Sequence, residues 1–279
     1  MMVPAMAIMG GLVLFPLFNG IRMSFTNASP LKPDTHWVGL ENFAYLFEDR
    51  EFGEVIYNSV FIIGSSTILS LVIGFAIALL LNSGIRGAGF FRAAIFQVWI
   101  VPWIVIAILW GWLYNSDFGL INHILMQLGI LREPVNWLFN EIPAQITIIT
   151  GYTWRSIPFM MVVSLAALQS IPKEIMEAAS IDGAGFFRRV VYIIIPLMRN
   201  ILMVLALVQA VRLIQDMTLP WVLTHGGPIN STMTISMYTF KLAFDSWDFG
   251  LASAVGTLWL FVLILLAAIS MRTLSRNTN

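Results

Sequence analysis

The chain has 279 residues, of which 58% are hydrophobic and only 11% are charged, and its formal net charge at pH 7 is zero. Soluble globular proteins usually have about 25% charged residues, so a water-soluble core of this length cannot bury so much apolar surface, and lipid is the expected solvent. The balanced charge gives no reason to expect a nucleic-acid partner, and the absence of cysteine from the sequence excludes disulfides and thiolate metal sites.

Six stretches are long enough to cross a membrane as helices, since a span needs roughly 20 apolar residues. In chain order they are residues 1–25, 56–81, 90–114, 142–168, 196–223 and 251–271. The first stretch is apolar from its start and has no small-residue cleavage site after a basic region, so it is expected to be a retained span rather than a signal peptide. The fifth is interrupted by polar residues and a proline. The sequence therefore predicts an all-α integral membrane protein with a single transmembrane domain.

The loops between these stretches form two sets that differ in charge. One set, made of residues 82–92, residues 169–195 and the C-terminal tail, carries Arg86, Arg92, Lys173, Arg188, Arg189, Arg272 and Arg276. The other set, 26–55, 115–141 and 216–250, has four basic residues against twelve acidic ones. Basic residues mark the cytoplasmic side of a membrane, so both chain ends are predicted to lie in the cytoplasm.

The loop over residues 169–195 is too regular to be a simple linker. It begins QSIPKEIMEAASIDGAGFFRRVVYII. Pro172 suits the first turn of a helix, apolar residues then recur at helical spacing, and Gly183 breaks the helix. Asp182 is placed to cap a second short apolar helix over 186–195. A helix, a glycine turn and a second helix are therefore predicted on the cytoplasmic face.

Two interpretations fit this helical loop. It lies flat on the lipid headgroups as an interfacial helix, or it docks into a groove of a cytoplasmic partner. In the second interpretation the small Ala178 and Ala179 permit close approach, and Glu177 anchors a cation or backbone amides of the partner. The pattern favours docking.

The fifth stretch carries a group of polar residues inside a predicted span. By helical spacing Gln209, Arg212, Gln215 and Asp216 share one face, and Arg212 and Asp216 are placed to pair across one turn. An arginine at the bilayer centre costs about 2.5–3.5 kcal/mol on insertion scales, so such residues usually face a cavity or a partner. Either the pair only neutralises itself, or this face lines a path in which a hydroxyl-rich solute exchanges hydrogen bonds with it.

Tryptophans are further candidates for lining such a path. Trp103 and Trp110 lie seven residues apart on one face of the third stretch, and Trp154 lies in the fourth. Their rings suit stacking on a sugar ring, although packing against lipid or other helices is the commoner use. The neighbouring Arg155 is expected to lie near an interface, on a packing helix bent at Pro158.

Catalytic chemistry is not evident in the sequence. No GK dipeptide occurs, so the chain has no P-loop and cannot bind ATP by that route. His36, His123 and His225 lack metal-ligand spacing, and no nucleophile–base pair lies within the spans. The chain is expected to be neither an enzyme nor the holder of a cofactor. An ion-driven carrier or channel is the alternative class of transporter; it needs buried carboxylates near mid-membrane, and only Asp216, near one end of a span, comes close.

The helical loop resembles the EAA loop of ABC importer permeases. The family pattern is EAA, three residues, G, nine residues and I-x-L-P; this chain has EAA at 177–179, Gly183 and IIIP at 193–196. In that family the loop forms the coupling helix, which sits in a cleft of the nucleotide-binding subunit. The resemblance implies that the residues that couple this chain to an ATPase are Glu177, Ala178, Ala179, Asp182 and Gly183.

Other segments resemble the carbohydrate branch of the same family, the maltose-type and glycerol-phosphate-type permeases. GLENF at 39–43 resembles GL-x-NF, and NSDFGLIN at 115–122 resembles NPDFGLIN. WRSIPF at 154–159 resembles W-x-x-x-PF, and LTHGGP at 223–228 resembles LTGGGP, with His225 in place of a glycine. The resemblance thus extends over nearly the whole chain.

The resemblance implies a type I ABC importer permease with six transmembrane helices and a cytoplasmic coupling helix, in the cytoplasmic (inner) membrane of a bacterium or archaeon. The implied partners are a second homologous permease subunit, two ATP-binding-cassette ATPase subunits that hold ATP and Mg, and an extracytoplasmic solute-binding protein. The solute is expected to be a sugar or sugar-like molecule: mono-, di- and oligosaccharides, polyols, uronate polymers and glycerol phosphates all remain open. In the family the helix after the EAA loop contributes to the sugar site.

Overall fold

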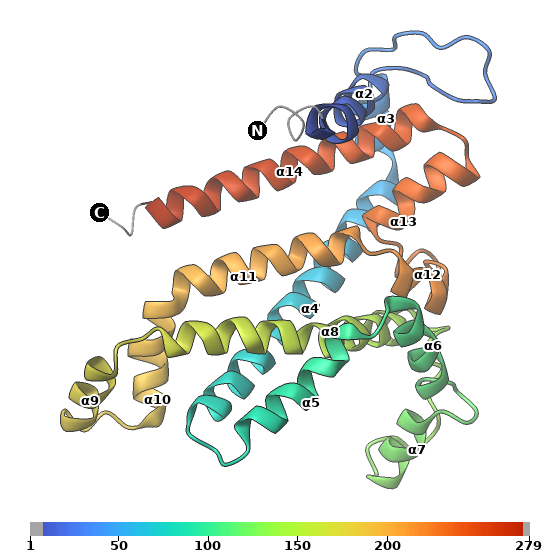
Figure 1. Ribbon diagram of the computed structural model, residues 1–279. Coiled ribbons are helices and arrows are strands. Elements are labelled where there is room, and N and C mark those ends of the chain that lie inside the picture. The colour runs from blue at the N-terminus through green and yellow to red at the C-terminus, as the bar shows by residue number, and fades with distance from the viewer. Residues whose placement is uncertain (1–7, 276–279) are drawn as a thin grey trace.

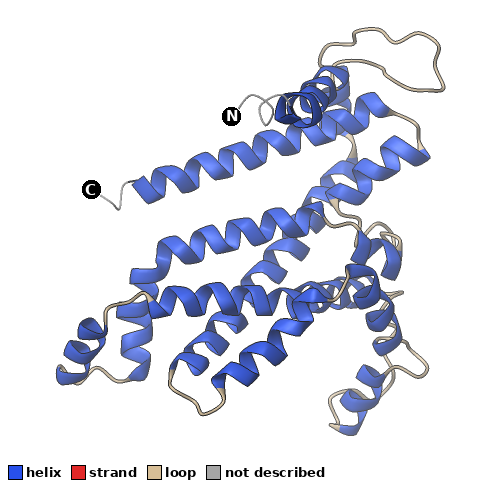
Figure 2. Cartoon of the chain, in the orientation of Figure 1, coloured by secondary structure: helices blue, strands red, loops and turns tan. Residues whose placement is uncertain are grey.

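The computed structural model describes residues 8–275, which fold into helices joined by turns and loops (Figures 1 and 2). A π-helical turn, Gly10–Leu14, leads into α2, Phe15–Met23. The helices that follow are α3 Glu41–Glu48, α4 Arg50–Asn82, α5 Ala88–Ile100, α6 Trp103–Leu113, α7 Leu120–Gln127, α8 Glu141–Gln169 and α9 Lys173–Ile181. The second half holds α10 Phe186–Arg189, α11 Ile195–Gln215, α12 Thr218–Thr224, α13 Ile235–Phe240 and α14 Phe249–Ser275, with π-helical turns at Val190–Ile194 and Lys241–Asp245.

The helices confirm an all-α protein with membrane-spanning character. Within the described residues, three helical stretches are by themselves long and apolar enough to cross a membrane: Arg50–Asn82, Phe186–Gln215 and Phe249–Ala268. Two bent pairs, α5 with α6 and α8 with α9, raise that number to five if each pair is one span. The N-terminal helix Gly10–Met23 is shorter, and the first part of the predicted span 1–25 lies outside the described residues. Six crossings therefore remain a prediction.

The third predicted span, 90–114, is not one helix. It consists of α5 and α6, which meet at 95°. Val101 is extended, with φ −63° and ψ 126°, because the residue before a proline is pushed out of the α region. Pro102 in turn lacks the N–H that would continue the helix. The tight bend turns α6 across the end of α8 (Figure 1).

The fifth predicted span, 196–223, begins earlier and ends earlier than the sequence indicated. Residues 186–215 form one helical stretch through α10, the π-helical turn and α11. The stretch bends, because α10 and the π-helical turn over residues 186–194 run in a different direction from α11, which agrees with the prediction of a separate short helix over 186–195 (Figure 1). Asp216 ends this stretch with extended backbone, φ −83° and ψ 125°, and its carboxylate accepts the backbone N–H of Leu219 at 3.2 Å, which caps the start of α12.

The long helices α4 and α8 cross and pack along much of their length (Figure 1). At their closest approach a Cβ added to Gly74 would lie 2.5 Å from Cβ of Met160, so only glycine fits there. Pro158 lies inside α8 without ending it. Helices α9 and α10 lie at one end of the molecule, and α3, α6, α7, α12 and α13 lie toward the other (Figure 1).

Candidate functional site

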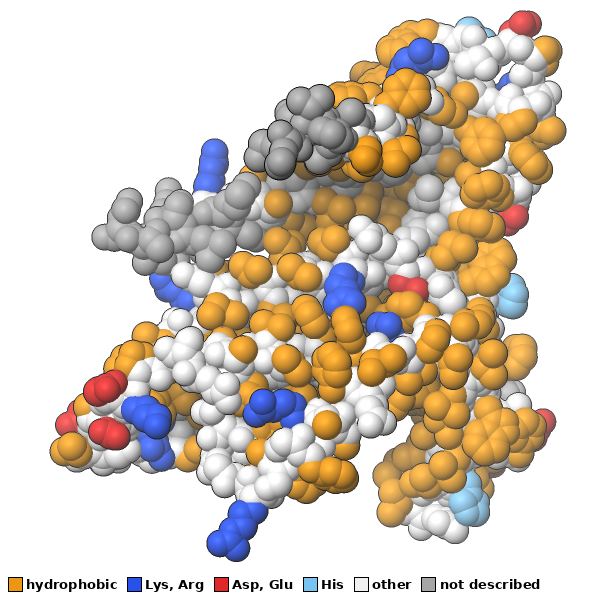
Figure 3. All heavy atoms as spheres, in the orientation of Figure 1, with side chains coloured by type: hydrophobic (Ala, Val, Ile, Leu, Met, Phe, Trp, Pro, Cys, Tyr) orange, Lys and Arg blue, Asp and Glu red, His pale blue; other side chains and the backbone are white. Residues whose placement is uncertain are grey.

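A charged cluster lies in the middle of the molecule, where the break between α5 and α6 and the end of α11 meet the unbroken helix α8. We call it the arginine cluster; its members are Trp103, Tyr152, Arg155, Arg212 and Asp216. They come from the start of α6, from α8, and from the end of α11 with the residue that follows it. In Figure 3 a few basic and acidic side chains lie in the middle of the face, surrounded by hydrophobic and uncharged ones.

Arg155 is held at the break between α5 and α6. Its Nε donates to the carbonyl oxygen of Val101 at 3.0 Å, and its guanidinium carbon lies 4.1 Å from the centre of the Trp103 ring. The side chain is only partly buried. Sequence reasoning favoured a packing role near an interface, but the structure places Arg155 in the cluster; its only signal in the sequence was an arginine inside an apolar stretch.

Arg212 lies beside a second aromatic pair. Its guanidinium carbon is 4.9 Å from the centre of the Phe159 ring and 5.3 Å from that of Trp99. It is close enough to Arg155 for the two positive charges to repel each other. Within residues 8–275 the structure records no ion pair between Arg212 and Asp216, so the predicted pairing is wrong, because the helix ends before Asp216.

Asp216 instead bonds to α8 and α12. Its Oδ2 accepts the hydroxyl of Tyr152 at 3.0 Å as well as the Leu219 N–H, and the Tyr152 hydroxyl also lies 3.1 Å from the Asp216 carbonyl oxygen. Tyr152 is fully buried and was not singled out from the sequence. Two guanidinium groups and one carboxylate therefore share the cluster, with the carboxylate already engaged.

The other polar residues of the fifth stretch separate from this cluster. Gln209 is buried and donates from Nε2 to Oγ of Ser156, whose hydroxyl in turn donates to the Tyr152 carbonyl, so it joins α11 to α8. Gln215 is exposed at the last turn of α11. The predicted four-residue face is therefore not a continuous stripe, and only Arg212 and Asp216 lie in the cluster.

Of the three tryptophans predicted to line a path, one lies in the cluster and two lie in the neighbouring core. Trp103 belongs to the cluster and packs edge-on against Tyr152, with ring centres 5.2 Å apart. Trp110 is buried; its Nε1 donates to Oγ1 of Thr150 at 3.1 Å, and its ring lies 5.0 Å from that of Trp154. Trp110 and Trp154 therefore support the core next to the cluster. Partly exposed guanidinium donors beside aromatic faces can bind a ligand that offers both oxygen atoms and a ring or chain to pack against.

At the other end of the molecule α9 stands apart from the long helices (Figure 1). Gly183 ends it with φ +73°, and the backbone N–H of Ala184 bonds to the Ala179 carbonyl at 2.9 Å, which is the usual glycine-terminated helix end. Asp182 is the C-cap residue of α9. The N-cap residue of α10 is Gly185, so the prediction that Asp182 caps the second helix is wrong.

The predicted coupling residues differ in their exposure to solvent. Ala179 is buried, whereas Glu177, Ala178, Asp182 and Gly183 are exposed. Beneath α9 lies a cavity of about 430 Å³, between the ends of α4 and α8 and the start of the stretch at 186. Nη1 of Arg189 donates to Oγ of Ser180 at 3.0 Å, which ties α9 to that stretch.

Comparison with known proteins gives consistent matches over most of the chain. The family described as "Binding-protein-dependent transport system inner membrane component" matches residues 58–279. The trehalose/maltose transport system permease protein MalF of Thermococcus litoralis is 34% identical over 265 residues, which covers 95% of this chain and 88% of that protein. The diacetylchitobiose uptake system permease protein NgcF of Streptomyces coelicolor is 32% identical over 273 residues, which covers 92% and 76%.

The fold also has counterparts among solved structures. A bacterial ABC transporter involved in the import of the acidic polysaccharide alginate contains a chain that superposes with a TM-score of 0.81 at 20% identity, covering all of this chain and 95% of that one. A chain of the MetNI methionine ABC transporter superposes with a TM-score of 0.55 at 16% identity. Nothing in these matches supports an ion-driven carrier or channel. The chain belongs to the family of inner membrane components of binding-protein-dependent transport systems, and it is a permease subunit of an ABC importer.

Proposed function

We propose that this permease carries a sugar or sugar-like solute into the cell through a path lined by the arginine cluster. An extracytoplasmic binding protein delivers the solute, and ATP is hydrolysed with Mg in two ATPase subunits. The curated relatives described above are permeases for trehalose/maltose and for diacetylchitobiose, which supports a carbohydrate. A second homologous permease completes the assembly, because one chain offers one coupling loop to two ATPases.

The observation that carries the proposal is the exposed end of α9. Glu177 and Ala178 are exposed, Glu177 at the rim of the cavity beneath α9, and Gly183 fixes where the helix stops. A nine-residue helix that exposes a carboxylate beside a small residue suits a cleft on a cytoplasmic ATPase. Ala179 is buried and Arg189 bonds to Ser180, so a push on α9 is passed to the long helices rather than absorbed in a loose loop.

The proposed orientation follows from the position of the charges. The end that holds α9 and α10 carries Lys173, Arg188 and Arg189, and the opposite end is rich in acidic residues. Because basic residues mark the cytoplasmic side, α9 faces the cytoplasm and both chain ends lie there. The N-terminal helix, the bent pair α5–α6 and α8, together with the three long apolar stretches, then make six crossings of the cytoplasmic membrane of a bacterium or archaeon.

Uptake by the reconstituted importer tests this function. The chain is placed in liposomes with its second permease and ATPase, its binding protein is added outside, and radiolabelled maltose, an acidic oligosaccharide, a polyol and glycerol phosphate are offered in turn. We expect uptake of at least one of them only when ATP is inside and the binding protein is outside. Uptake that follows an ion gradient without ATP would contradict the proposal.

A further inference from the structure

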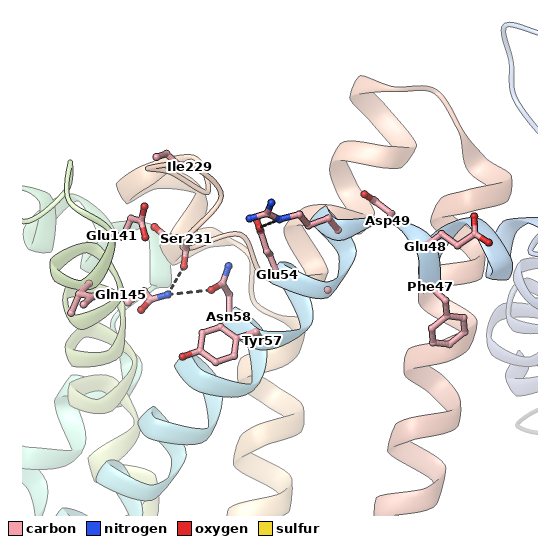
Figure 4. Close-up of a pocket in the computed structure, with 13 residues that line it drawn as sticks. Phe47, Glu48, Asp49, Glu54, Tyr57, Asn58, Glu141, Gln145, Ile229 and Ser231 are labelled. Atoms are coloured by element: carbon pink, nitrogen blue, oxygen red, sulfur yellow. Dashed lines mark hydrogen bonds and ion pairs between the residues drawn. The ribbon is translucent and has the colours of Figure 1, made fainter.

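A large acidic cavity opens at the end of the molecule opposite α9, between the first turns of α4 and α8 and the loop that follows Pro228. Its volume is about 810 Å³. Figure 4 shows Glu141 and Gln145 on α8 opposite Glu54 and Asn58 on α4. Four carboxylates and one guanidinium line it: Glu48, Asp49, Glu54, Glu141 and Arg50. This cavity is distinct from the arginine cluster and has no part in it.

Two of the four carboxylates are already used by the fold. Asp49 accepts the backbone N–H of Glu51 at the start of α4 and the hydroxyl of Tyr238 at 2.9 Å. Glu54 pairs with Arg50 at 3.0 Å. Glu48 and Glu141 form no ion pair with any residue in the part of the chain that the structure describes. Among the residues that line it, the cavity therefore has four carboxylates against one guanidinium, and two of the carboxylates are in no ion pair within residues 8–275.

The floor of the cavity is built from buried amides. Nε2 of Gln145 donates to Oδ1 of Asn58 at 3.2 Å and to the Ser231 carbonyl oxygen at 2.8 Å (Figure 4). Nδ2 of Asn58 donates to the Asn230 carbonyl oxygen at 2.7 Å. Asn58 and Gln145 are 5% and 8% exposed. These bonds join α4, α8 and the 230 loop, so the floor is fixed.

One polar atom of the lining is left without a partner. Ser231 is 8% exposed and lines the cavity, yet its Oγ forms no hydrogen bond within the described part of the chain. Buried hydroxyl groups are almost always hydrogen-bonded, because leaving one unmade costs free energy. An orphan hydroxyl beside unbalanced carboxylates indicates that a donor from outside completes this site.

The shape and chemistry of the cavity exclude a bare metal ion as that donor. Within residues 8–275 no group of three or more His, Cys, Asp and Glu side chains could hold a metal, and the volume is far larger than a metal ion needs. An ammonium or guanidinium group fits, because it donates several hydrogen bonds to carboxylate and hydroxyl oxygens at once. The preference for basic residues inside the cell explains why bases are few here, but it does not require this many acids.

We propose that the cavity receives a lysine or arginine side chain of the extracytoplasmic solute-binding protein. This inference rests on the proposed function, which places this end of the molecule outside the cell. The family takes its name from dependence on a binding protein, which is therefore the partner expected at this end. A neighbouring hollow of about 690 Å³, lined by Glu41, Glu48 and Asp248, extends the acidic surface and steers a basic partner toward the cavity.

The test measures binding of the purified solute-binding protein to the complete importer in nanodiscs, at 20 and 300 mM sodium chloride. The variants are Glu141→Gln, Glu48→Gln, their double variant and Ser231→Ala, and the matched control is Glu133→Gln, an exposed outer-loop acid that lines neither hollow. We expect the double variant to bind about tenfold more weakly and to lose most of the salt dependence. Ser231→Ala should weaken binding by a smaller factor, and Glu133→Gln should bind as the wild type does.

A charge exchange makes the test specific. Glu141→Lys should abolish binding, and one lysine-to-glutamate or arginine-to-glutamate change in the binding protein should restore it. If the double variant binds like the wild type while the wild type still takes up solute, the docking inference is wrong and the transport function stands. If the double variant instead loses its second permease on purification, the cavity belongs to the interface between permeases. If the wild type takes up no solute, it is the proposed function that fails.

Discussion

Arg155 donates a hydrogen bond from Nε to the carbonyl oxygen of Val101, the extended residue at which the third predicted span bends. The same guanidinium lies over Trp103, the first residue of the next helix. One side chain of α8 therefore holds both sides of the break between α5 and α6. The bend and the arginine cluster depend on each other, so disturbing one should alter the other.

Replacing Arg155 by glutamine should lower the rate of solute uptake strongly while lowering the melting temperature only slightly. The change removes a hydrogen bond at the break and a cation–π contact worth about 2 kcal/mol when desolvated, so we expect uptake by the reconstituted importer to fall about tenfold or more. Arg155→Lys keeps the charge but loses the planar donor and should be intermediate. If the glutamine variant melts like the wild type and takes up solute at an unchanged rate, Arg155 does not contribute to the translocation path.

Replacing Gly183 by alanine should loosen the link between ATP hydrolysis and uptake. At φ +73° an L-residue costs about 1–2 kcal/mol, which should displace the end of α9. The measurement is the number of solute molecules carried per ATP hydrolysed, which we expect to fall while the complex stays assembled. The control is Gly185→Ala, because Gly185 has φ −65° and open space around its Cβ position. An equal effect at both glycines would contradict a role for this helix end.

Glu177→Gln tests the exposed carboxylate of α9 without disturbing its backbone. The Glu177 side chain makes no ion pair within residues 8–275 and is exposed, so the melting temperature should not change. If α9 docks on the ATPase as proposed, the substitution should reduce the ATPase rate that the binding protein stimulates, because it removes the charge that the proposal assigns to that contact. Glu174→Gln, on the first turn of the same helix, is the matched control and should leave that rate as it is.

Gly74→Ala should destabilise the crossing of α4 and α8. The added Cβ would meet Cβ of Met160 at 2.5 Å and the backbone nitrogen of Met161 at 2.9 Å, and such overpacking typically costs about 1–3 kcal/mol. The melting temperature in detergent should fall accordingly. Gly64→Ala on the same helix has nothing within 4 Å of its added Cβ and should not lower it. Equal melting of the two variants would show that the helices can move apart there.

Much of the fold was predictable because the apolar stretches are long and their caps and glycines are local signals. Gly183 was correctly predicted to end α9, since a glycine after a run of helical spacing leaves little choice. The break at Pro102 is also a local signal. It was missed because the residues on both sides are apolar, so the segment was predicted as one continuous span. Asp216 was assigned to the preceding helix because spacing alone does not show that its carboxylate caps the next one.

The arginine cluster was only half predictable, because its members come from three separate segments. Arg212 could be found by its cost in a membrane, but its aromatic neighbours Phe159 and Trp99 lie on other helices. Gln209 looked equivalent to Arg212 by spacing, and only the position of Ser156 on α8 shows that it is buried and bonded. The acidic cavity was visible only as a surplus of acids in the outer loops.

The stretch Phe186–Gln215 has a mechanical consequence for transport. At 1.5 Å per residue the 21 residues of α11 alone extend about 32 Å. Arg189 near one end is bonded to α9, and Arg212 near the other end lies in the arginine cluster. The segment is bent rather than straight, because α10 and the π-helical turn run in a different direction from α11 (Figure 1). A tilt imposed on α9 would therefore swing α11 as the long arm of a lever and move Arg212 relative to its aromatic partners Phe159 and Trp99.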